Sequence, residues 1–254
     1  MFRSTALLFL AGLVASAVNA AAGGGTLLSF PALMATGLSA LAANATSTVG
    51  LLLGYFTSTA GYREEMRELR REAVEGIAPS IIGGSAGAAL LLVLGAKVFA
   101  RLVPWLLIGS SALLLAQPLV QRLASRSAGP RSKAAVWTGL LVISVYVGYF
   151  GAGAGILFLA VMGLLYGKPL GQVNAIKVFV NTLANVIAAL TLVGVELIHP
   201  TGALAWRQMA PLAAGAVLGG FAGVRVARKL PPAALRAFAA LVGLCIAVKF
   251  IFFS

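Results

Sequence analysis

Acidic side chains are scarce in this chain, and aspartate is absent. The 254 residues include 6 acidic and 19 basic ones, and all the glutamates except Glu196 fall between Glu64 and Glu75. There is one cysteine, Cys245, and one histidine, His199. A single cysteine excludes an internal disulfide, a CxxC redox pair and an iron–sulfur cluster. A single histidine leaves little material for a metal site or a Ser/His/Asp triad. We therefore expect no catalytic residues, no metal, no cofactor and no enzymatic activity.

Charge of either sign is also sparse, since 10% of the residues are charged and 60% are hydrophobic. The mean hydropathy is +1.00. A soluble domain is about a quarter charged, and no soluble fold of this size could bury so much apolar surface. The composition therefore predicts an all-α polytopic membrane protein whose main partner is the lipid bilayer. The net charge of +13 would suggest nucleic acid in a soluble protein. Here the basic residues separate apolar runs, as the positive-inside rule describes, so we expect no nucleic-acid partner.

The N-terminus imitates a signal peptide, because Arg3 precedes an apolar stretch and Val18-Asn19-Ala20 resembles a cleavage site. A matching apolar stretch at 134–150 holds the same place before a second glycine cluster. We therefore expect the first stretch to be part of the fold.

Hydropathy predicts the passes. The apolar stretches lie near 4–22, 25–43, 44–62, 77–96 and 102–120, and then near 134–150, 154–167, 174–194, 208–224 and 234–253. A helix needs roughly 20 residues to cross the hydrocarbon. Glycine clusters separate the first two stretches of each half, so these stretches are either full passes or the arms of a hairpin. Either reading gives each half an odd number of crossings and inverts the second half.

The two parts of the chain match each other. At an offset of 130 the identical pairs are Ala22/Ala152, Gly23/Gly153, Gly25/Gly155, Leu27/Leu157, Gly37/Gly167, Asn44/Asn174 and Ala45/Ala175. At an offset of 132 they are Pro79/Pro211, Gly83/Gly215, Gly87/Gly219 and Lys97/Lys229. Two homologous halves are typical of transporters. We therefore expect a first transmembrane repeat at 1–120, a basic cytoplasmic linker at 121–133 and a second transmembrane repeat at 134–254.

Basic residues support this inverted arrangement. They gather in three loops: Arg63, Arg67, Arg70 and Arg71; Arg122, Arg126, Arg131 and Lys133; and Arg225, Arg228 and Lys229. If each half has an odd number of crossings, all three loops lie on the cytoplasmic face. Lys97, Arg101 and Arg3 then lie on the opposite face. The segment 63–75 is expected to be a short, charged, solvated helix, with opposite charges at helical spacing.

The glycine-rich segments are the first candidates for a substrate site. Interrupted membrane helices expose N–H groups and positive helix ends that can hold an anion. The alternative is that these glycines only permit close helix packing. Polar residues follow each segment. The candidate residues are Gly23, Gly24, Gly25, Thr26, Asn44, Thr46 and Ser47 from the first half, and Gly151, Gly153, Gly155, Asn174, Lys177 and Asn181 from the second.

Lys177 is the most unusual of these residues. It lies in an apolar helix with no acidic residue within 18 positions, and asparagines at 174, 181 and 185 share its helix face. A lysine in a membrane helix usually faces a cavity or a partner, so we expect it to bind a small anionic substrate. The alternative is that Lys177 extends to the lipid headgroups, because it lies only about one turn from the expected start of its helix.

The motifs resemble a known family. Gly23-Gly24-Gly25-Thr26-Leu27 with Pro31, followed by Asn44-Ala45-Thr46-Ser47, resembles the first half of the TauE/SafE family of sulfite-exporter-like membrane proteins. Gly151-Ala152-Gly153-Ala154-Gly155 with Asn174 and Lys177 resembles its second repeat. The resemblance covers nearly the whole chain. It implies a multi-pass transporter of the bacterial inner (plasma) membrane for sulfur-containing anions such as sulfite or organosulfonates. The second half departs from the first, with Val161 at the position of Pro31, and Ile176 and Lys177 in place of the Thr-Ser pair.

The scarcity of acidic residues also bears on mechanism. Proton-coupled transporters usually have an intramembrane Asp, Glu or His. Here only Glu196 and His199 are candidates, and we expect them to form a loop pair before Pro200. An anion leaving an inside-negative cell gains about 2.3 kcal/mol per charge per 100 mV, so export needs no coupling ion. We expect export by alternating access. The alternative is a non-transporting membrane scaffold or accessory subunit. The Ala/Gly-rich faces would suit a homodimer, which nothing in the sequence requires.

Overall fold

The computed structural model describes residues 2–21, 23–60, 62–125, 132–166, 168–226 and 232–253. Every regular element in this part of the chain is a helix, which confirms the all-α expectation. The helices are α1 (Phe2–Ala21), α2 (Thr26–Met34), α3 (Ala40–Gly50), α4 (Leu52–Ala60), α5 (Arg63–Glu68), α6 (Arg70–Leu115), α7 (Gln117–Ser125), α8 (Lys133–Tyr149), α9 (Ala154–Tyr166), α10 (Leu170–Ile198), α11 (Trp206–Val226) and α12 (Pro232–Phe253). Outside the described residues lie Ala22, Arg126, Arg131, Gly167, Arg228 and Lys229 of the expectations above.

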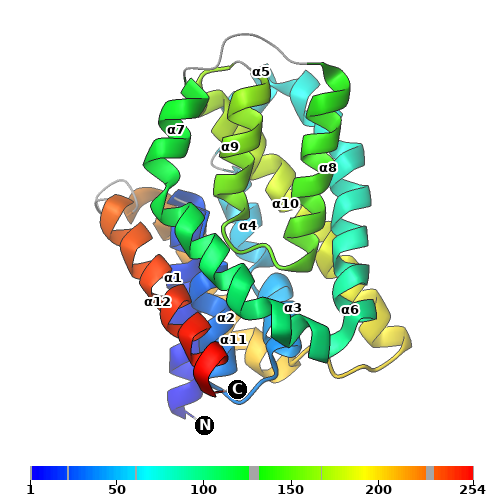
Figure 1. Ribbon diagram of the computed structural model, residues 1–254, viewed down its shortest axis with the longest axis vertical. Helices are drawn as coiled ribbons and strands as arrows, with labels where there is room; N and C mark the ends of the chain where they lie inside the picture. The colour runs from blue at the N-terminus through cyan, green and yellow to red at the C-terminus, as the bar shows by residue number, and fades with distance from the viewer. Residues whose placement is uncertain are drawn as a thin grey trace.

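Two helical hairpins are the central feature of the fold. In Figure 1 the α1–α2 hairpin comes from the lower end of the molecule and the α8–α9 hairpin from the upper end. Gly23 turns the first hairpin with a φ of 81°, and Gly151 and Gly153 turn the second with a φ of 72° each, a conformation that favours glycine. The returning arms, α2 of 9 residues and α9 of 13 residues, are shorter than the roughly 20 residues that a crossing needs. Both therefore turn back inside the molecule.

One expected boundary was wrong. The sequence suggested a break between residues 43 and 44, whereas the structure ends α2 at Met34 and starts α3 at Ala40. Gly37 adopts a φ of 92°, and the Ser39 side chain caps α3 by accepting a hydrogen bond from the backbone N–H of Ala42. These two residues set the turn, because a left-handed glycine and a serine N-cap are local stop and start signals. A hydropathy profile does not detect such local signals.

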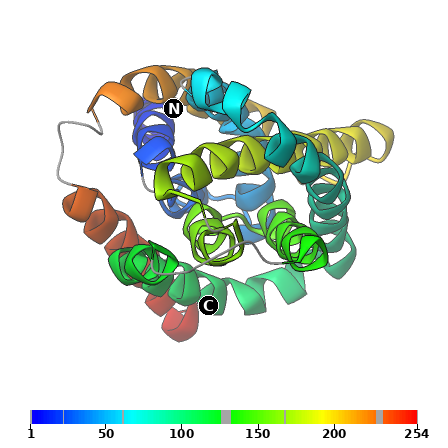
Figure 2. The same ribbon diagram turned by 90° about the horizontal axis from the view of Figure 1, so that it is seen from above.

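Two helices in the described part are long and apolar enough to cross a membrane, α6 and residues 171–198 of α10. α6 bends at Gly95, where φ is 70° and ψ is 178°, so it forms two legs that correspond to the apolar stretches at 77–96 and 102–120. The boundary expected after residue 120 falls inside α7. Seen from above in Figure 2, α10 crosses the centre of the molecule. It packs against α3, α4, α6, α8 and α9.

Glycines let α11 approach α1 closely. A Cβ on Gly215 would overlap the carbonyl oxygen of Phe9, and one on Gly219 would overlap that of Leu13. Backbones this close leave no room for side chains, which is the usual role of small residues in membrane helix pairs.

The same contact recurs between α6 and α8. A Cβ on Gly83 would lie 2.8 Å from the carbonyl oxygen of Leu141, and one on Gly87 would overlap that of Val145. Each of these four residues lies 132 positions from its counterpart in the α1–α11 contact. α1 of the first part therefore packs on α11 of the second, and α8 of the second packs on α6 of the first, through equivalent residues.

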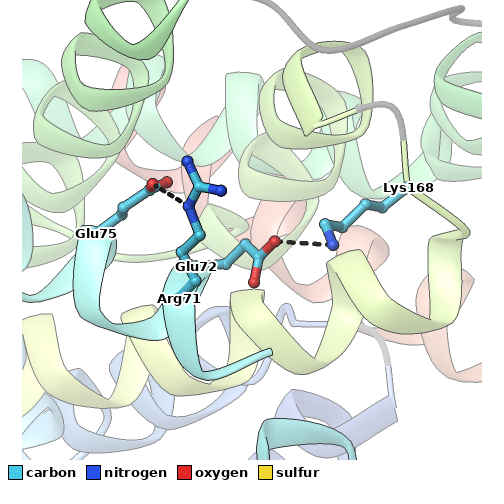
Figure 3. Close-up of polar contacts among 4 residues, drawn as sticks. All are labelled: Arg71, Glu72, Glu75 and Lys168. Carbon is cyan, nitrogen blue, oxygen red and sulfur yellow. Dashed lines mark hydrogen bonds and ion pairs between the residues drawn. The ribbon is translucent and has the colours of Figure 1, made fainter. Parts of the chain in front are cut away.

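The charged helix α5, with the sequence REEMRE, lies at the upper end of the molecule in Figure 1. The expected charged helix at 63–75 is divided by Leu69 into α5 and the start of α6. Figure 3 shows two ion pairs here, Arg71 with Glu75 at 3.3 Å and Lys168 with Glu72 at 2.8 Å. The second pair links α6 to the segment between α9 and α10. It therefore joins elements from the two parts of the chain.

Candidate functional site

The two glycine-bearing breaks meet inside the molecule. A Cβ placed on Gly23 would lie 2.9 Å from Cα of Gly155, and a Cβ placed on Gly155 would lie 3.0 Å from Cα of Gly23. The first distance is shorter than real Cβ contacts and the second is tighter than most of them, so the contact favours glycine on both sides. The tips of the α1–α2 and α8–α9 hairpins are therefore in direct backbone contact.

Lys177 lies beside this contact. A Cβ on Gly155 would be 3.6 Å from Cδ of Lys177, so the aliphatic part of the lysine packs on the glycine. The residue is 3% exposed, and its Nζ is buried without a hydrogen-bond partner among the described residues. α10 begins at Leu170, so Lys177 lies about two turns inside its helix rather than one. The alternative in which Lys177 extends to the headgroups is wrong, because the ammonium is enclosed by protein.

The surroundings of Lys177 are electropositive. α2 and α9 both begin at the glycine breaks, and the N-terminal end of a helix has a partial positive charge. None of the described glutamates forms an ion pair with Lys177: five lie in α5 or the first two turns of α6, and Glu196 lies near the end of α10. A buried cation without a carboxylate is unfavourable unless an anion can reach it.

Tyr55 connects several candidate residues that lie far apart in the sequence. Its hydroxyl accepts a hydrogen bond from Nδ2 of Asn19 at 3.2 Å, and Oδ1 of Asn19 accepts one from the backbone N–H of Gly25 at 2.7 Å. The same hydroxyl is in polar contact with the side chains of Thr26 and Asn181. Thr26, Gly25 and Asn181 are therefore joined through Asn19 and Tyr55, which were not among the candidates. In the sequence, the only indication of their role was that Asn19 and Tyr55 are polar residues within apolar stretches.

The Thr-Ser pair after the first break has internal partners. Oγ1 of Thr46 accepts a hydrogen bond from the backbone N–H of Ala205 at 3.0 Å. The hydroxyls of Ser47 and Ser29 lie 2.7 Å apart. Both Thr46 and Ser47 are fully buried. They hold α3 to α2 and to the segment before α11, a structural role in the described arrangement.

The two repeat-paired asparagines differ. Nδ2 of Asn44 donates to the carbonyl oxygen of Tyr149 at 2.9 Å, while Oδ1 of Asn44 is buried without a partner. Nδ2 of Asn174 donates to the hydroxyl of Tyr62 at 2.9 Å, at the start of α5. Asn44 thus ties α3 to the end of α8 beside the second break. Asn174 lies toward the charged end instead.

The remaining glycine candidates serve packing and chain direction. A Cβ on Gly24 would lie 3.0 Å from the side chain of Leu114, and one on Gly153 would lie 3.3 Å from Cβ of Ser110. Gly151 faces only its own helix, at Val147. These positions shape the breaks, whereas Gly23 and Gly155 form the contact between them.

Lys177 is closed off in this conformation. Lys177 is 3% exposed, and it lines neither the pocket of about 730 Å³ beside α5 nor three smaller pockets of the described residues. Within the same residues no group of three or more His, Cys, Asp or Glu side chains could hold a metal ion.

Glu196 has a different partner from the expected one. Its carboxylate accepts hydrogen bonds from the backbone N–H groups of Thr201, Gly202 and Ala203 and from the Thr201 hydroxyl. His199 is exposed, and the described residues show no ion pair between it and Glu196. Glu196 therefore organises the turn before α11, because the loop needs an acceptor for three adjacent N–H groups.

A buried polar site between interrupted apolar helices is typical of membrane transporters. Comparison with known proteins agrees with this class. The profile of the family described as Sulfite exporter TauE/SafE matches residues 8–250. The chain therefore belongs to the TauE/SafE family of membrane transporters, as its motifs suggested.

Several relatives share most of its length. The chain is 27% identical over 250 residues to a Sinorhizobium protein named probable membrane transporter protein ORF9, covering 98% of this chain and 92% of that protein. It is 26% identical to a probable membrane transporter protein of Haemophilus influenzae, covering 87% and 84%. It is 29% identical to the probable membrane transporter protein YfcA of Escherichia coli K12, covering 77% and 73%. No solved structure matches significantly.

Proposed function

We propose that this protein transports small anions across the bacterial inner membrane, as a multi-pass protein, and that the anion binds at Lys177 where Gly23 meets Gly155. The observation that supports this most strongly is the buried, unpartnered ammonium of Lys177. An isolated buried cation lowers the stability of a fold, so its presence between two helix N-termini is best explained by an anionic ligand.

Sulfur-containing oxyanions such as sulfite and organosulfonates are the proposed substrates. The family is described as a sulfite exporter family. An ammonium, the side-chain amides near it and backbone N–H groups at two helix ends all suit the oxygen atoms of such anions. The chemistry of the site supports an anionic substrate, and the family description supports one that contains sulfur.

The proposed mechanism is alternating access between two inverted halves, residues 1–120 and 134–254, joined by the cytoplasmic linker 121–133. It is supported by the hairpins that come from opposite ends in Figure 1 and by the reciprocal packing of α1 on α11 and α8 on α6. In such a mechanism the halves rock about a site between them and open it to one side at a time. The enclosed Lys177 corresponds to a conformation closed to both sides.

The proposed direction is export without a coupling ion. Glu196 is fully engaged by the loop at 201–203, and the other glutamates lie near α5, so no carboxylate of the described residues is free beside Lys177. The membrane potential alone drives an anion outward, by about 2.3 kcal/mol per charge per 100 mV. A strict requirement for protons or sodium would contradict this mechanism.

Sulfite and organosulfonate flux in proteoliposomes tests the proposal, with an imposed potential and with wild-type protein beside Lys177→Met. The matched control is Lys249→Met, which removes an exposed lysine from the apolar helix α12. We expect potential-driven flux in the wild type and the control, and background flux in Lys177→Met. Equal flux in all three would place the anion site elsewhere. No flux of any anion would favour the scaffold alternative.

A further inference from the structure

The largest of the four pockets is an open groove of about 730 Å³ beside α5, with α4, α6 and α10 contributing to its walls. It is separate from Lys177, which does not line it. Among the residues that line it are three arginines, Arg63, Arg67 and Arg70, and no acidic residue. The groove thus combines a cationic rim with a large volume.

The three arginines come from two consecutive helices, α5 and α6, and line the same groove. The step of four residues puts Arg63 and Arg67 on one face of α5, and the turn at Leu69 brings Arg70, the first residue of α6, to the same groove. All three are exposed. None has a carboxylate within ion-pair distance in the described residues, whereas Arg71 at the same end is paired with Glu75. The rim therefore has three charges available for an external anion.

The floor of the groove is apolar and accessible. Phe56 is 49% exposed, Val74 58% and Ile77 37%, and Phe179 contributes from α10. On α6, steps of four and three residues put Arg70, Val74 and Ile77 on one face, with the charge at the start of the helix. Ile77 lies about 10 Å further along the axis than Arg70. The charge of Arg70 and the apolar surface of Val74 and Ile77 therefore follow one another along α6, which is long and apolar enough to span a membrane.

We propose that this groove binds an anionic phospholipid, with the phosphate and headgroup at the three arginines and the acyl chain along Phe56, Val74 and Ile77. Guanidinium groups bind phosphate with paired hydrogen bonds. Basic pockets between membrane helices, at the face where positive charge gathers, are suited to anionic lipid headgroups. A small anion would fill the rim and leave the apolar floor uncovered. Lipid binding at this groove does not depend on which substrate is transported.

Native mass spectrometry of the purified full-length protein in detergent tests the proposal, with phosphatidylglycerol and phosphatidylcholine as probes. The main variant is Arg63→Gln/Arg67→Gln/Arg70→Gln, and the control is Lys97→Gln/Arg101→Gln, two exposed basic residues on α6 beyond the bend at Gly95. We expect the wild type to prefer phosphatidylglycerol. The groove variant should lose affinity for it on the order of 100-fold, since each basic residue contributes roughly fivefold. The control should match the wild type.

Each of the other outcomes would overturn the proposal. Equal binding of the two lipids would show that charge does not select the occupant. Unchanged phosphatidylglycerol binding in the groove variant would place the lipid elsewhere. Displacement by glycerol phosphate as effective as by intact lipid would indicate a small-anion site. Loss of a dimer in the groove variant, without any lipid dependence, would indicate a second copy of the chain. Single Arg→Gln variants, each weakened roughly fivefold, guard against misfolding of the triple variant.

Discussion

Ser47 and Lys177 occupy matching positions, 130 residues apart, after the two glycine breaks, yet their surroundings are opposite. The hydroxyl of Ser47 lies 2.7 Å from that of Ser29, and its neighbour Thr46 accepts a hydrogen bond from Ala205. The ammonium of Lys177 is as buried but has no partner among the described residues. The Ser47 side chain therefore stabilises the fold, whereas the Lys177 side chain has an unsatisfied charge.

This difference separates a polar group with an internal partner from an unpaired one at the candidate site. A buried polar group with a partner contributes modestly to stability, whereas one without a partner lowers it. Proteins tolerate such local conflicts mainly at functional sites. Position after a glycine break therefore does not identify a binding residue by itself. The buried ammonium of Lys177, which has no partner among the described residues, is the stronger reason to propose one.

The largest expected effect on stability comes from placing a lysine at position 47, which matches Lys177 in the first half. Ser47→Lys would bury an ammonium among groups that already satisfy one another, and we expect it to destabilise the protein by more than about 3 kcal/mol. The converse change, Lys177→Met, removes an unpaired charge while keeping the aliphatic length that packs on Gly155, and it should leave the melting temperature equal or higher. Thermal unfolding in detergent measures both. If Ser47→Lys were as stable as the wild type, the surroundings of Ser47 and Lys177 would not differ in their tolerance of a buried charge.

The next effect concerns the contact between the breaks. Gly155→Ala would bring a methyl group to 3.0 Å from Cα of Gly23, and we expect a loss of roughly 1–3 kcal/mol. Gly171→Ala is the matched control, because a Cβ there meets nothing within 4 Å. That change should be neutral or slightly stabilising, since alanine favours the helix. Equal melting temperatures for the two variants would mean that the hairpin tips are not in contact.

A smaller effect is expected from Ser47→Ala. Removing this hydroxyl leaves that of Ser29 buried without its partner, which should cost about 1 kcal/mol. The double variant Ser29→Ala/Ser47→Ala should recover part of that loss, and anion flux should be retained in both. If Ser47→Ala abolished flux without unfolding the protein, the first half would also bind substrate.

The smallest effect belongs to the ion pair between Glu72 and Lys168. Their side chains are 14% and 31% exposed, so Glu72→Gln should change stability by less than about 1 kcal/mol, and the difference should shrink at high salt. Unfolding measured at low and high ionic strength tests this. A large loss that does not depend on salt would mean that the pair is buried against a further partner.

The sequence predicted the parts of the site that depend on composition. Gly23, Gly155 and Lys177 stand out because glycine clusters and a lone cation are unusual in apolar stretches, and the structure brings these three together. The all-α fold was also predictable from composition, because long apolar stretches indicate membrane helices. The family assignment followed from the motifs and is confirmed by the profile match.

What the sequence missed depends on contacts between distant segments. Asn19 resembled part of a cleavage site and Tyr55 was not singled out, because only the fold brings them to Gly25 and Asn181. The partners of Thr46 and Ser47 likewise come from other helices. The turn at 35–39 was missed because local capping by Ser39 and the left-handed Gly37 overrides hydropathy.

The most direct test of the account is equilibrium binding of radiolabelled sulfite to purified protein, with wild type compared with Lys177→Ser and Ser47→Ala. We expect Lys177→Ser to bind on the order of 100-fold more weakly, as loss of a charge-assisted contact implies, and Ser47→Ala to bind like the wild type. Sulfite binding by Lys177→Ser that equals the wild type would contradict the assignment of the buried lysine as the anion site.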